Sequence, residues 1–484
     1  MTKDKNYIFK SLSKVSESLG RNQTPFTSEM KNLKQFFLLA FAMPMFLLTS
    51  CEDSDECKTV CASNQILTID CECVTQVVDP CKDTDCPTGF VCSNGDCIEE
   101  ASSTITKAGL LSADEKWTAN KTYILQGKVV VPSGVTLTIE PGTIIKGSSG
   151  TGSLASALVV ARGGKILAEG TADKPIVMTS VKDNIQIGEK AGTNLDEKIT
   201  GEWGGLIILG KAPISAGSGA EAQIEGIPAD DTYGAYGGSE VADNSGVLKY
   251  VSVRHGGALI GEGNEINGIT FGGVGNGTVV ENIEVIGNED DGIELFGGSV
   301  NIKNALVWAQ KDDGYDVDQA YSGTIDGFIY IAGADSDHAF EIDGPENAVN
   351  NTGKFTAKNG FLKGSLTASN GEYADWRDNA QGSVLDSYFF NFADGKDIEL
   401  DKEKGVSANY TAGKIIMSGN EFNLPDGVDL ASIFKDTDPS GNDTKFKADM
   451  IKVNTATKTR TKGVDPALFS WTFAQAKGAL ADFK

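Results

Sequence analysis

The chain has 484 residues, of which 40% are hydrophobic and 23% are charged, a composition that excludes both a disordered chain and a long coiled coil. Its 57 glycines, against 13 prolines, favour many tight turns between short strands over long helices. Acidic residues outnumber basic residues by 67 to 42, and the net charge of −25 disfavours nucleic acids, anionic membranes and polyanionic polysaccharides as partners.

The N-terminal part of the chain predicts a secretion signal. Residues 1–29 contain no long apolar run, and we attribute them to a start codon assigned too early, with Met30 as the true start. Residues 30–50 join a basic beginning to an apolar stretch over residues 36–48, which is too short to span a bilayer as a helix. This segment is therefore expected to be a cleaved signal peptide.

The signal ends on Leu-Thr-Ser-Cys, which resembles the lipobox of bacterial lipoproteins. The resemblance implies that Cys51 carries a covalent diacylglycerol and N-acyl lipid anchor, and an ordinary cleaved signal is the alternative. The anchor and an acidic tether occupy residues 51–56, and the tether resembles the surface-export signal of Bacteroidota lipoproteins. Its acidic residues are Glu52, Asp53, Asp55 and Glu56. The resemblance implies an outer-membrane location facing the cell exterior; a solvated charged tether is the alternative.

All nine cysteines lie between residues 51 and 97, which is typical of an oxidising compartment. Apart from the anchor they are Cys57, Cys61, Cys71, Cys73, Cys81, Cys86, Cys92 and Cys97. Four disulfides are expected, with the connectivity left open, and a zinc site is disfavoured because the segment lacks both a Cys-x-x-Cys pair and a histidine. Residues 57–100 resemble a small EGF-like module, which would serve as a disulfide-stabilised stalk.

A repeat of short strands defines the next domain, predicted over residues 108–423. Residues 290–295, Asp-Asp-Gly-Ile-Glu-Leu, recur at 312–317, an offset of 22, and more loosely at 337–342, a further 25. A second motif at residues 281–285 recurs with offsets of 22 and 23. This period is typical of a right-handed parallel β-helix with coils about 4.8 Å apart, and a leucine-rich repeat is excluded because its Leu-x-x-Leu-x-Leu pattern is absent.

Several segments of this domain carry a family resemblance. They are GEWGGLIILGKAP at 201–213, GVLKYVSVRHGG at 246–257, DDGIELFGG at 290–298 and SDHAFEIDGPEN at 336–347. They resemble a mostly uncharacterised group of Bacteroidota surface-exposed lipoproteins with a pectin-lyase-like β-helix. The resemblance covers residues 108–484; it implies fold and location, and it transfers no catalytic residue.

The repeat also predicts which side chains face outward. Because side chains alternate along a strand, Glu294, Asp316 and Glu341 should stack on the outside while their neighbours enter the core. Stacked carboxylates repel one another, and calcium, which binds six to eight oxygens, could compensate for the repulsion. The candidate ligands are Asp290, Asp291, Glu294, Asp312, Asp313, Asp316, Asp337 and Glu341. The alternative is that the turn aspartates cap backbone N–H groups and the outer row is solvated.

The same carboxylates allow an enzymatic interpretation, since polysaccharide hydrolases use paired acids. The candidate pairs are Asp312 with Asp313 and Asp291 with Asp316, assisted by His338; a lyase base would be Arg254 or Arg377. Known β-helix hydrolases also show Gly-His-Gly, which is absent here, and Arg-x-Lys, which occurs only at 460–462, past the repeats. Structural roles are therefore favoured for both arginines and for His255 and His338.

Residues 424–484 carry apolar residues at helical spacing and are predicted to form a C-terminal cap over a solenoid end. The expected cap residues are Phe469, Trp471, Phe473 and Leu480, and docking onto a partner is their alternative role. The sequence thus predicts an all-β chain, with an EGF-like module, a parallel β-helix solenoid and a helical or loop cap.

The predicted function is a non-catalytic binding or assembly subunit at the cell surface. Its partner would be an outer-membrane protein complex such as a transporter, or a surface glycan, with no nucleic acid and with membrane contact through the lipid alone. The predicted cofactors are the lipid at Cys51 and Ca²⁺. The alternative function is a calcium-dependent polysaccharide-active enzyme, either a lyase or a glycoside hydrolase.

Overall fold

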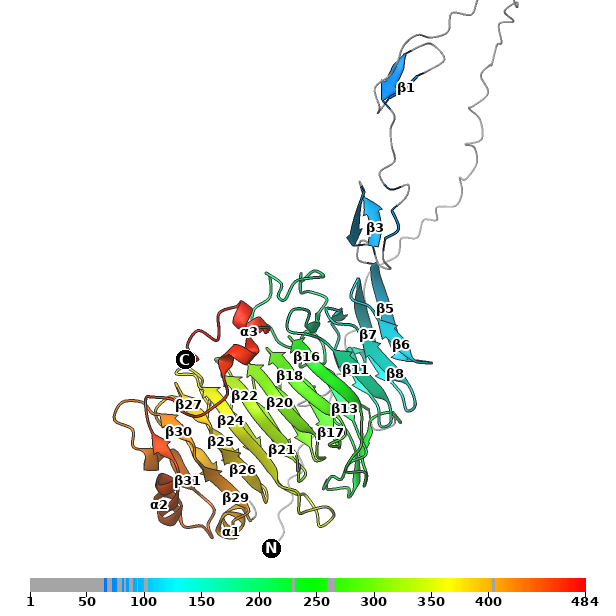
Figure 1. The fold of residues 1–484 in the computed structure, drawn as a ribbon. Helices are drawn as coiled ribbons and strands as arrows, with labels where there is room; N and C mark the ends of the chain where they lie inside the picture. The colour runs from blue at the N-terminus through cyan, green and yellow to red at the C-terminus, as the bar shows by residue number, and fades with distance from the viewer. Residues whose placement is uncertain are drawn as a thin grey trace, which may run out of the picture. The chain divides into compact units, whose positions relative to one another are not determined.

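The computed structural model describes residues 65–67, 72–75, 81, 84–86, 90–93, 95–99, 103–228, 231–259, 266–402 and 405–484 (Figure 1). The predicted signal peptide, the lipid anchor Cys51, the acidic tether and three of the other cysteines, Cys57, Cys61 and Cys71, lie outside these residues. The chain divides into two compact units, Met1–Val78 and Asp79–Lys484. Within the described ranges, no helix is both long enough and apolar enough to cross a bilayer.

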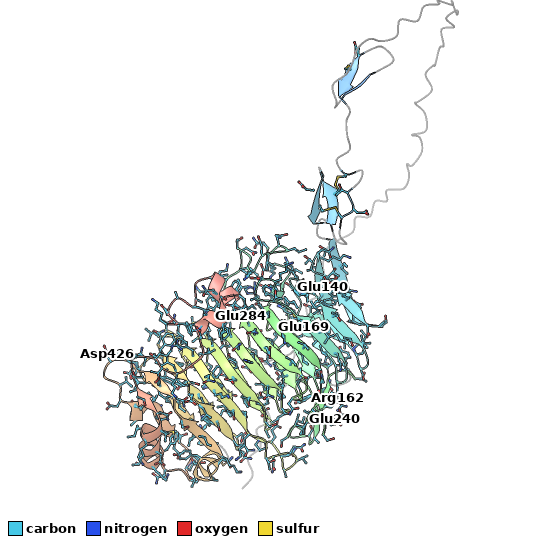
Figure 2. The ribbon with its side chains drawn as sticks, in the orientation of Figure 1. Glu140, Arg162, Glu169, Glu240, Glu284 and Asp426 are labelled. Atoms are coloured by element: carbon cyan, nitrogen blue, oxygen red, sulfur yellow. A yellow bond between two sulfur atoms is a disulfide. The ribbon has the colours of Figure 1, made fainter. Side chains whose placement is uncertain are left out.

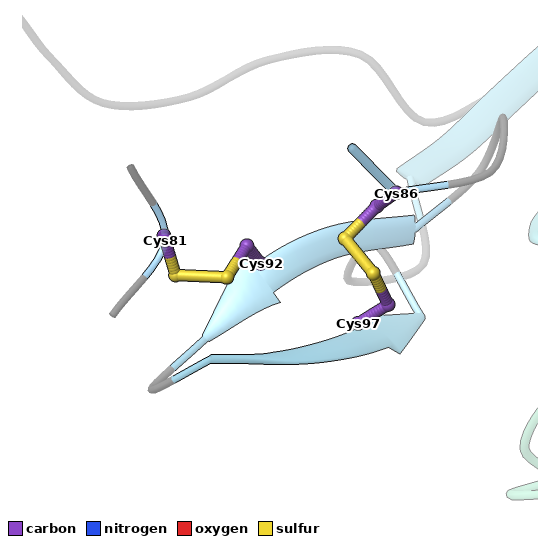
Figure 3. Close-up of a disulfide and its surroundings, with 4 residues drawn as sticks. All are labelled: Cys81, Cys86, Cys92 and Cys97. Atoms are coloured by element: carbon purple, nitrogen blue, oxygen red, sulfur yellow. A yellow bond between two sulfur atoms is a disulfide. The ribbon is translucent and has the colours of Figure 1, made fainter. Parts of the chain in front are cut away.

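The N-terminal unit contains one antiparallel pair, β1 (Gln65–Leu67) with β2 (Cys73–Thr75), and Cys73 is disulfide-bonded. The second unit begins with the antiparallel hairpin of β3 (Phe90–Ser93) and β4 (Asp96–Glu99). Disulfides join the preceding segment to both strands of this hairpin, Cys81 to Cys92 of β3 and Cys86 to Cys97 of β4 (Figure 3). The predicted disulfides are confirmed for these cysteines, and the structure supplies the pairing that the spacing left open.

The rest of the second unit is a parallel β-helix with three sheets, which we name A, B and C in the order in which each coil visits them. Sheet A contains β6 (Glu115–Trp117), β8 (Thr136–Ile139), β11 (Lys165–Glu169), β26 (Gly382–Leu385), β29 (Ile415–Ser418) and the first halves of β16 (Gly246–Arg254), β18 (Val279–Ile286), β20 (Asn301–Trp308), β22 (Thr324–Ile331) and β24 (Phe355–Lys363). Sheet B contains the second halves of the same five strands, the first parts of β5 (Ser103–Leu110) and β7 (Lys121–Val131), and β9 (Ile144–Gly147), β12 (Ile176–Ser180), β27 (Tyr388–Phe390), β30 (Glu421–Asn423) and β32 (Thr455–Ala456).

Sheet C closes each coil. After the ends of β5 and β7 it contains β10 (Ala157–Val160), β13 (Leu206–Leu209), β17 (Ile269–Gly272), β19 (Ile293–Phe296), β21 (Tyr315–Asp318), β23 (Phe340–Ile342), β25 (Ala374–Trp376), β28 (Ile398–Leu400) and β31 (Phe434–Asp436). Its outer face is apolar at the N-terminal end, where an excursion containing the hairpin of β14 (Glu221–Gln223) and β15 (Ala235–Gly237) covers it.

The corner between sheets A and B is made by single residues in the left-handed conformation. Asn282, Asn304 and Asn359 occupy it with φ near 56° to 60°, and asparagine tolerates this region better than most residues because its short side chain bonds locally. Asn304 Nδ2 donates to Asn282 Oδ1 of the previous coil over 3.0 Å. One residue therefore turns the chain and ties consecutive coils together.

The register confirms the predicted repeat. Glu294 pairs with Asp316, and Asp316 pairs with Glu341, which are the predicted offsets of 22 and 25. Residues facing the opposite way are at most 1% exposed and belong to the continuous core; these are Ile293, Leu295, Tyr315, Val317, Phe340 and Ile342. The predicted alternation of inward and outward side chains is therefore confirmed.

The predicted end cap is corrected in part. The paired strands run from Ser103 to Ala456, beyond both predicted limits of the β-helix. The C-terminal end is covered by α2 (Asp443–Val453), whose Phe446 and Met450 join the core. The remaining helical turns are short: η1 (Gly152–Leu154), α1 (Val406–Thr411), η2 (Leu430–Ile433), η3 (Pro466–Phe469) and α3 (Phe473–Ala476).

Residues 464–484, which we name the strap, pack along the outer side of sheet B. Phe469, Phe473 and Leu480 lie against an apolar row on that face, and Trp471 contacts Tyr250. The row contains Leu306, Ile329 and Phe361, which are in register with Glu284. Glu284, fully buried beneath the strap, accepts the backbone N–H groups of Phe473 and Ala474 over 3.0 and 2.9 Å (Figure 2). The aromatic residues therefore cover a side of the solenoid, because an uncovered apolar face would be exposed to water.

Candidate functional site

The outer face of sheet C carries a row of stacked carboxylates, which we name the acid ladder. Five consecutive strands, β19, β21, β23, β25 and β28, place an acid at the same register position. These acids are Glu294, Asp316, Glu341, Asp375 and Glu399. The next strand, β31, ends the row with Lys435. Neighbouring strands are about 4.8 Å apart, so the carboxylates repel one another strongly.

The acid ladder is not a solvated surface row. Glu294 is 6% exposed, and Oδ1 of Asp316 is buried without a hydrogen-bond partner among the described residues. Burial raises the pKa of Glu294 well above its usual value, and the charges of Glu225 and Asp316 raise it further. Burial likewise raises the pKa of Asp316, with Glu341 as the strongest charged neighbour, and raises that of Asp375 to about 7. The alternative of a simply solvated row is therefore wrong for its buried members.

The turns before these strands form a second row, and here the capping alternative is correct. Asp291 Oδ1 accepts the backbone N–H of Asp313 one coil later over 2.9 Å. Asp313 Oδ1 accepts the backbone N–H of His338 over 2.7 Å in the coil after that. The same turn aspartates also add negative charge beside the acid ladder.

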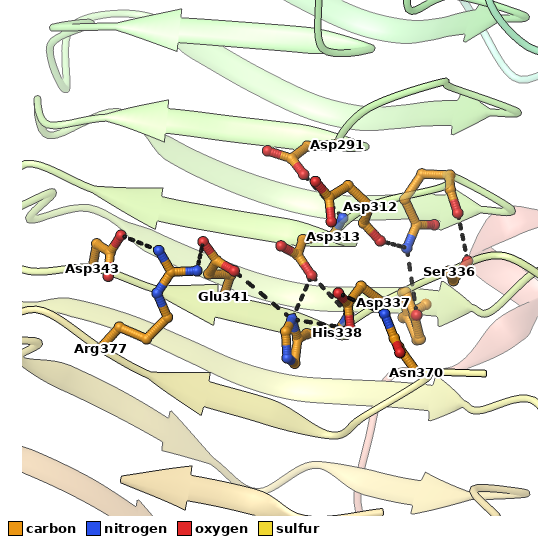
Figure 4. Close-up of polar contacts among 12 residues, drawn as sticks. Asp291, Asp312, Asp313, Ser336, Asp337, His338, Glu341, Asp343, Asn370 and Arg377 are labelled. Atoms are coloured by element: carbon orange, nitrogen blue, oxygen red, sulfur yellow. Dashed lines mark hydrogen bonds and ion pairs between the residues drawn. The ribbon is translucent and has the colours of Figure 1, made fainter. Parts of the chain in front are cut away.

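The structure brings the predicted ligands together in three groups, in each of which the ligand atoms lie within 4.8 Å of one another. The first, which we name the acid triad, is Asp291, Glu294 and Asp316. The second, the histidine triad, is Asp313, His338 and Glu341 (Figure 4). The third is Asp290, Asp291 and Asp312. Of the predicted ligands only Asp337 joins none of these groups; its Oδ2 accepts Asn370 Nδ2 over 3.1 Å.

The first two groups draw on equivalent positions of successive coils but combine them differently: the acid triad has one turn residue and two ladder residues, and the histidine triad has two turn residues and one ladder residue. The histidine triad lies one coil beyond the acid triad and holds its own cation: His338 Nδ1 lies 2.8 Å from Asp313 Oδ1 and 3.8 Å from Glu341 Oε2. Burial lowers the pKa of His338, but the hydrogen bond to Asp313 and its charge raise it by more, to about 10. In the preceding coil the position equivalent to His338 is Asp313, an acid. The acid triad therefore lacks the internal cation that its neighbour has.

A cavity of about 790 Å³ adjoins the carboxyl end of these strands. The acids in its lining are Asp318, Asp343, Glu346 and Asp378. The Arg377 guanidinium lies between two coils, bonded to Glu341 and 3.4 Å from Asp343 Oδ2, and these acids raise the arginine pKa despite its partial burial. Burial raises the pKa of Asp318 well above its usual value, and Asp343 and Glu346 add to the effect. The cavity is suited to positively charged groups.

The other candidate catalytic residues are held in contacts that stabilise the fold. Arg254 is 1% exposed, donates to Ser252 Oγ over 2.7 Å and lies against the Phe473 ring beneath the strap. His255 is buried in a left-handed turn with Nδ1 2.9 Å from the Ile199 carbonyl oxygen, and burial lowers its pKa. Arg460 donates to the Lys462 and Val464 carbonyls and stacks on Phe361. None of these three side chains reaches the acid ladder through a contact within the described residues.

The sequence reasoning missed the last two acids of the ladder. Asp375 follows Glu341 by 34 residues because long turns precede it, so the search for a period of 22 to 25 does not reach it. Glu399 had a local signal, since Ile398-Glu399-Leu400 repeats the Ile-Glu-Leu of residues 293–295. Lys435, which ends the row, bonds to Asp397 in the adjoining turn.

These features define a parallel β-helix whose C-terminal half presents an acidic face. Residues 109–474 match the family model of the pectate-lyase-like beta helix domain, which covers most of the chain. The chain therefore belongs to the pectate-lyase-like β-helix family. No curated protein matches it.

Proposed function

We propose that this protein is a lipid-anchored outer-membrane lipoprotein, exposed on the cell, that binds a partner without catalysis through the acid ladder of sheet C. The acid ladder carries this proposal: five acidic side chains from consecutive strands are stacked on one outer face. Stacking them costs folding free energy unless a ligand compensates for the charge. Binding surfaces commonly contain residues that lower the stability of the free protein because they contact a ligand.

The lining of the adjoining cavity supports binding over catalysis. Its side chains are carboxylates, amides and small residues, and none of the described lining residues is aromatic or basic. Arg377, the only one of the two lyase-base candidates on this face, is committed to Glu341 and Asp343. An arginine held in ion pairs of this kind is a poor proton acceptor because its guanidinium stays protonated.

Calcium binding at the acid triad forms part of the proposal. Three carboxylates from two adjacent coils supply a set of hard oxygen ligands, the chemistry that Ca²⁺ prefers. Asp316 Oδ1 has no other partner in the described part of the chain, and no protein cation occupies the position that His338 fills one coil later. A bound Ca²⁺ would neutralise the upper end of the acid ladder and hold its carboxylates ionised.

The proposed partner is an outer-membrane protein complex, such as a transporter, with a surface glycan as the other class. Solenoid faces suit extended contacts, and a basic surface on a partner would complement the acid ladder. The ladder test compares pull-downs from solubilised outer membranes. The variant Asp375→Asn/Glu399→Gln should lose the partner, whereas the matched sheet A variant Glu281→Gln/Asp326→Asn should retain it. Equal recovery with both variants would reject the ladder as the binding surface.

The location is tested separately. Cys51→Ala should abolish lipidation and release the protein from membranes. Replacing the tether acids Glu52, Asp53, Asp55 and Glu56 by neutral residues should leave the protein lipidated but facing the periplasm. Protease access on intact cells measures this second outcome, and unchanged surface exposure of the neutral variant would contradict the proposed role of the tether.

A calcium-dependent polysaccharide-active enzyme is the second candidate, and one observation favours it. Burial raises the pKa values of Asp313 and Asp375 to about 7, where a carboxyl group can act as an acid at neutral pH. Incubation with neutral and uronic polysaccharides in the presence of calcium tests it. Product formation that Asp313→Asn abolishes would replace the binding proposal with this one.

A further inference from the structure

A second cavity, of about 330 Å³, lies away from the acid ladder at the turns that join sheet B to sheet C. Its wall comes from two consecutive turns, at Trp308 to Lys311 and at Ala332 to Asp335, together with Ser365 from the turn of the next coil. The loop containing Lys198 and Thr200 closes one side. The volume lies at the lower end of the range typical of small-molecule sites. We name this cavity the Trp308 pocket.

Trp308 gives the pocket an aromatic wall. It stands in the outward row of sheet B between Ile286 and Ile331, and its ring meets Phe473 of the strap with centroids 6.2 Å apart. The chain has five tryptophans, and the other four, Trp117, Trp203, Trp376 and Trp471, are at most 1% exposed. Trp308 alone is partly exposed. An indole left at the edge of a cavity offers a flat apolar surface to a ligand.

The polar groups of the pocket are balanced in charge, in contrast to the acid ladder. Its lining contains two acids, Glu197 and Asp335, and two bases, Lys198 and Lys311. Lys311 Nζ lies 2.8 and 2.9 Å from the two carboxylate oxygens of Glu289 beside the pocket. An uncharged ligand is therefore favoured over an ion, and the net charge of −25 disfavours an anionic one further.

Gln310 contributes to the wall of the pocket from beneath its surface. Gln310 is 1% exposed, and its Oε1 has no partner among the described residues. Its Nε2 makes only long contacts, 3.3 Å to the Asp312 carbonyl and 3.4 Å to the Tyr330 hydroxyl. Because its side chain is buried and contacts Tyr330 of the core, Gln310 packs the wall and offers no accessible hydrogen-bonding group to a ligand.

We propose that the Trp308 pocket binds a neutral sugar unit of an oligosaccharide. A pyranose ring combines an apolar face of C–H groups, which packs on an indole, with equatorial hydroxyls that both donate and accept hydrogen bonds. Lys311 and Ser365 supply the polar groups beside the indole. This site is separate from the acid ladder, and it adds a glycan ligand whether or not the ladder binds its partner.

The test uses the full-length lipoprotein in detergent. An array of neutral and uronic oligosaccharides identifies binders, and acrylamide quenching of tryptophan fluorescence reports on Trp308, because the other four tryptophans are buried. A neutral oligosaccharide should bind and protect Trp308 from acrylamide. Trp308→Leu should weaken binding about tenfold, the loss expected for one aromatic contact.

A second variant guards against misfolding of the first, since Trp308 also touches the strap. Ala334 is exposed at the rim, so Ala334→Phe should block the pocket without disturbing the core. Ala408→Phe, at an exposed position of α1, is its matched control. Loss of binding with Ala334→Phe alone supports the pocket. Absence of any binder, preference for uronic sugars, binding that Ala334→Phe leaves unchanged, or protection of Trp308 by a peptide instead would each overturn the proposal.

Discussion

Sheets A and C of the same solenoid stack their charged residues in opposite ways. The outward row of sheet A alternates in sign along six consecutive strands; its members are Glu169, Lys249, Glu281, Lys303, Asp326 and Lys358. Two of the neighbouring pairs form ion pairs, Lys249 with Glu281 at 3.6 Å and Asp326 with Lys358 at 3.2 Å. Sheet C instead stacks five acids before its first lysine.

The burial of the two rows differs as well. The side chains of Lys249 and Glu281 are 35% and 40% exposed, so their interaction is screened and weak. Glu294 of the acid ladder is 6% exposed, so its charge destabilises the fold unless something neutralises it. Sheet C pairs Glu341 with Arg377 and His338, but no basic side chain bonds Glu294 or Asp316 among the described residues, and this separates it from sheet A. The following predictions test this contrast.

The largest effect is expected from removing the internal cation of sheet C. His338→Ala leaves the buried Asp313 without its positive partner and leaves Glu341 with Arg377 alone, and breaking a buried pair of this kind costs about 3 kcal/mol or more of unfolding free energy. Denaturant unfolding measures the loss, and His338→Lys, which retains a positive charge, should recover part of it. Equal stability of wild type and His338→Ala would contradict the role of His338 as a counterion.

The aspartate variant at the same position sharpens the comparison between the two triads. His338→Asp gives the histidine triad three carboxylates, as in the acid triad, and places at position 338 the residue type that Asp313 supplies one coil earlier. Calorimetric titration should then show one more calcium ion bound per chain than in wild type. An unchanged stoichiometry would mean that the acid triad is not a calcium site or that the arrangement does not transfer.

Calcium itself should give the next largest effect. At about a hundredfold excess over Kd a single bound ion adds about 2.7 kcal/mol of stability, so the Tm should rise with calcium and fall with EDTA. Asp316→Asn removes one ligand and lowers the local repulsion, so its Tm should be higher than that of wild type in EDTA and should respond weakly to calcium. Sheet A supplies the control, Asp326→Asn, which should keep the full calcium response. Coincident wild-type melting curves in EDTA and in calcium would remove the cofactor from the proposal.

A smaller effect should follow from pH. The pKa values of Asp313 and Asp375 are raised to about 7, so in the metal-free protein these groups bind protons more tightly when folded than when unfolded. Their contribution to stability is fully present below about pH 4 and is lost as the pH rises through about 7. The contribution of His338, whose pKa is raised from 6.5 to about 10, is fully present below about pH 6.5 and declines from there to about pH 10. Metal-free Tm should therefore fall between about pH 5 and about pH 7.5, while the gain from calcium grows; a flat Tm would show that these carboxyls are solvated.

The smallest effect is expected on sheet A. Lys303→Glu makes the outward row acidic over three consecutive strands, from Glu281 to Asp326, and so imitates the acid ladder on an exposed face. The loss should be about 0.5 to 1 kcal/mol and should shrink at high salt because exposed charges are screened. Lys303→Gln separates the loss of attraction from the gain of repulsion. A loss comparable with that of His338→Ala would mean that burial does not distinguish the two sheets.

Short-range patterns in the sequence determine the repeat, the strand register and the facing of the side chains. A motif such as Asp-Asp-Gly-Ile-Glu-Leu repeats every 22 to 25 residues because each coil must return to the same position, and strand alternation then fixes which residues face the core. The sequence therefore predicted the β-helix, its register over three coils and the outward position of Glu294, Asp316 and Glu341. The clustering of cysteines likewise predicted disulfides without their pairing.

Only the tertiary structure decided the features that depend on contacts between distant segments. The acid ladder continues to Asp375 and Glu399 although longer turns break the sequence period there. Backbone pairing between the strands keeps these acids in register. The strap packs on sheet B because the outer side of that sheet is apolar. The composition of the strap alone fits an end cap equally well. Finally, His338 is a counterion because folding places it within hydrogen-bond distance of Asp313, 25 residues earlier. The order of residues along the chain does not show that these two side chains meet.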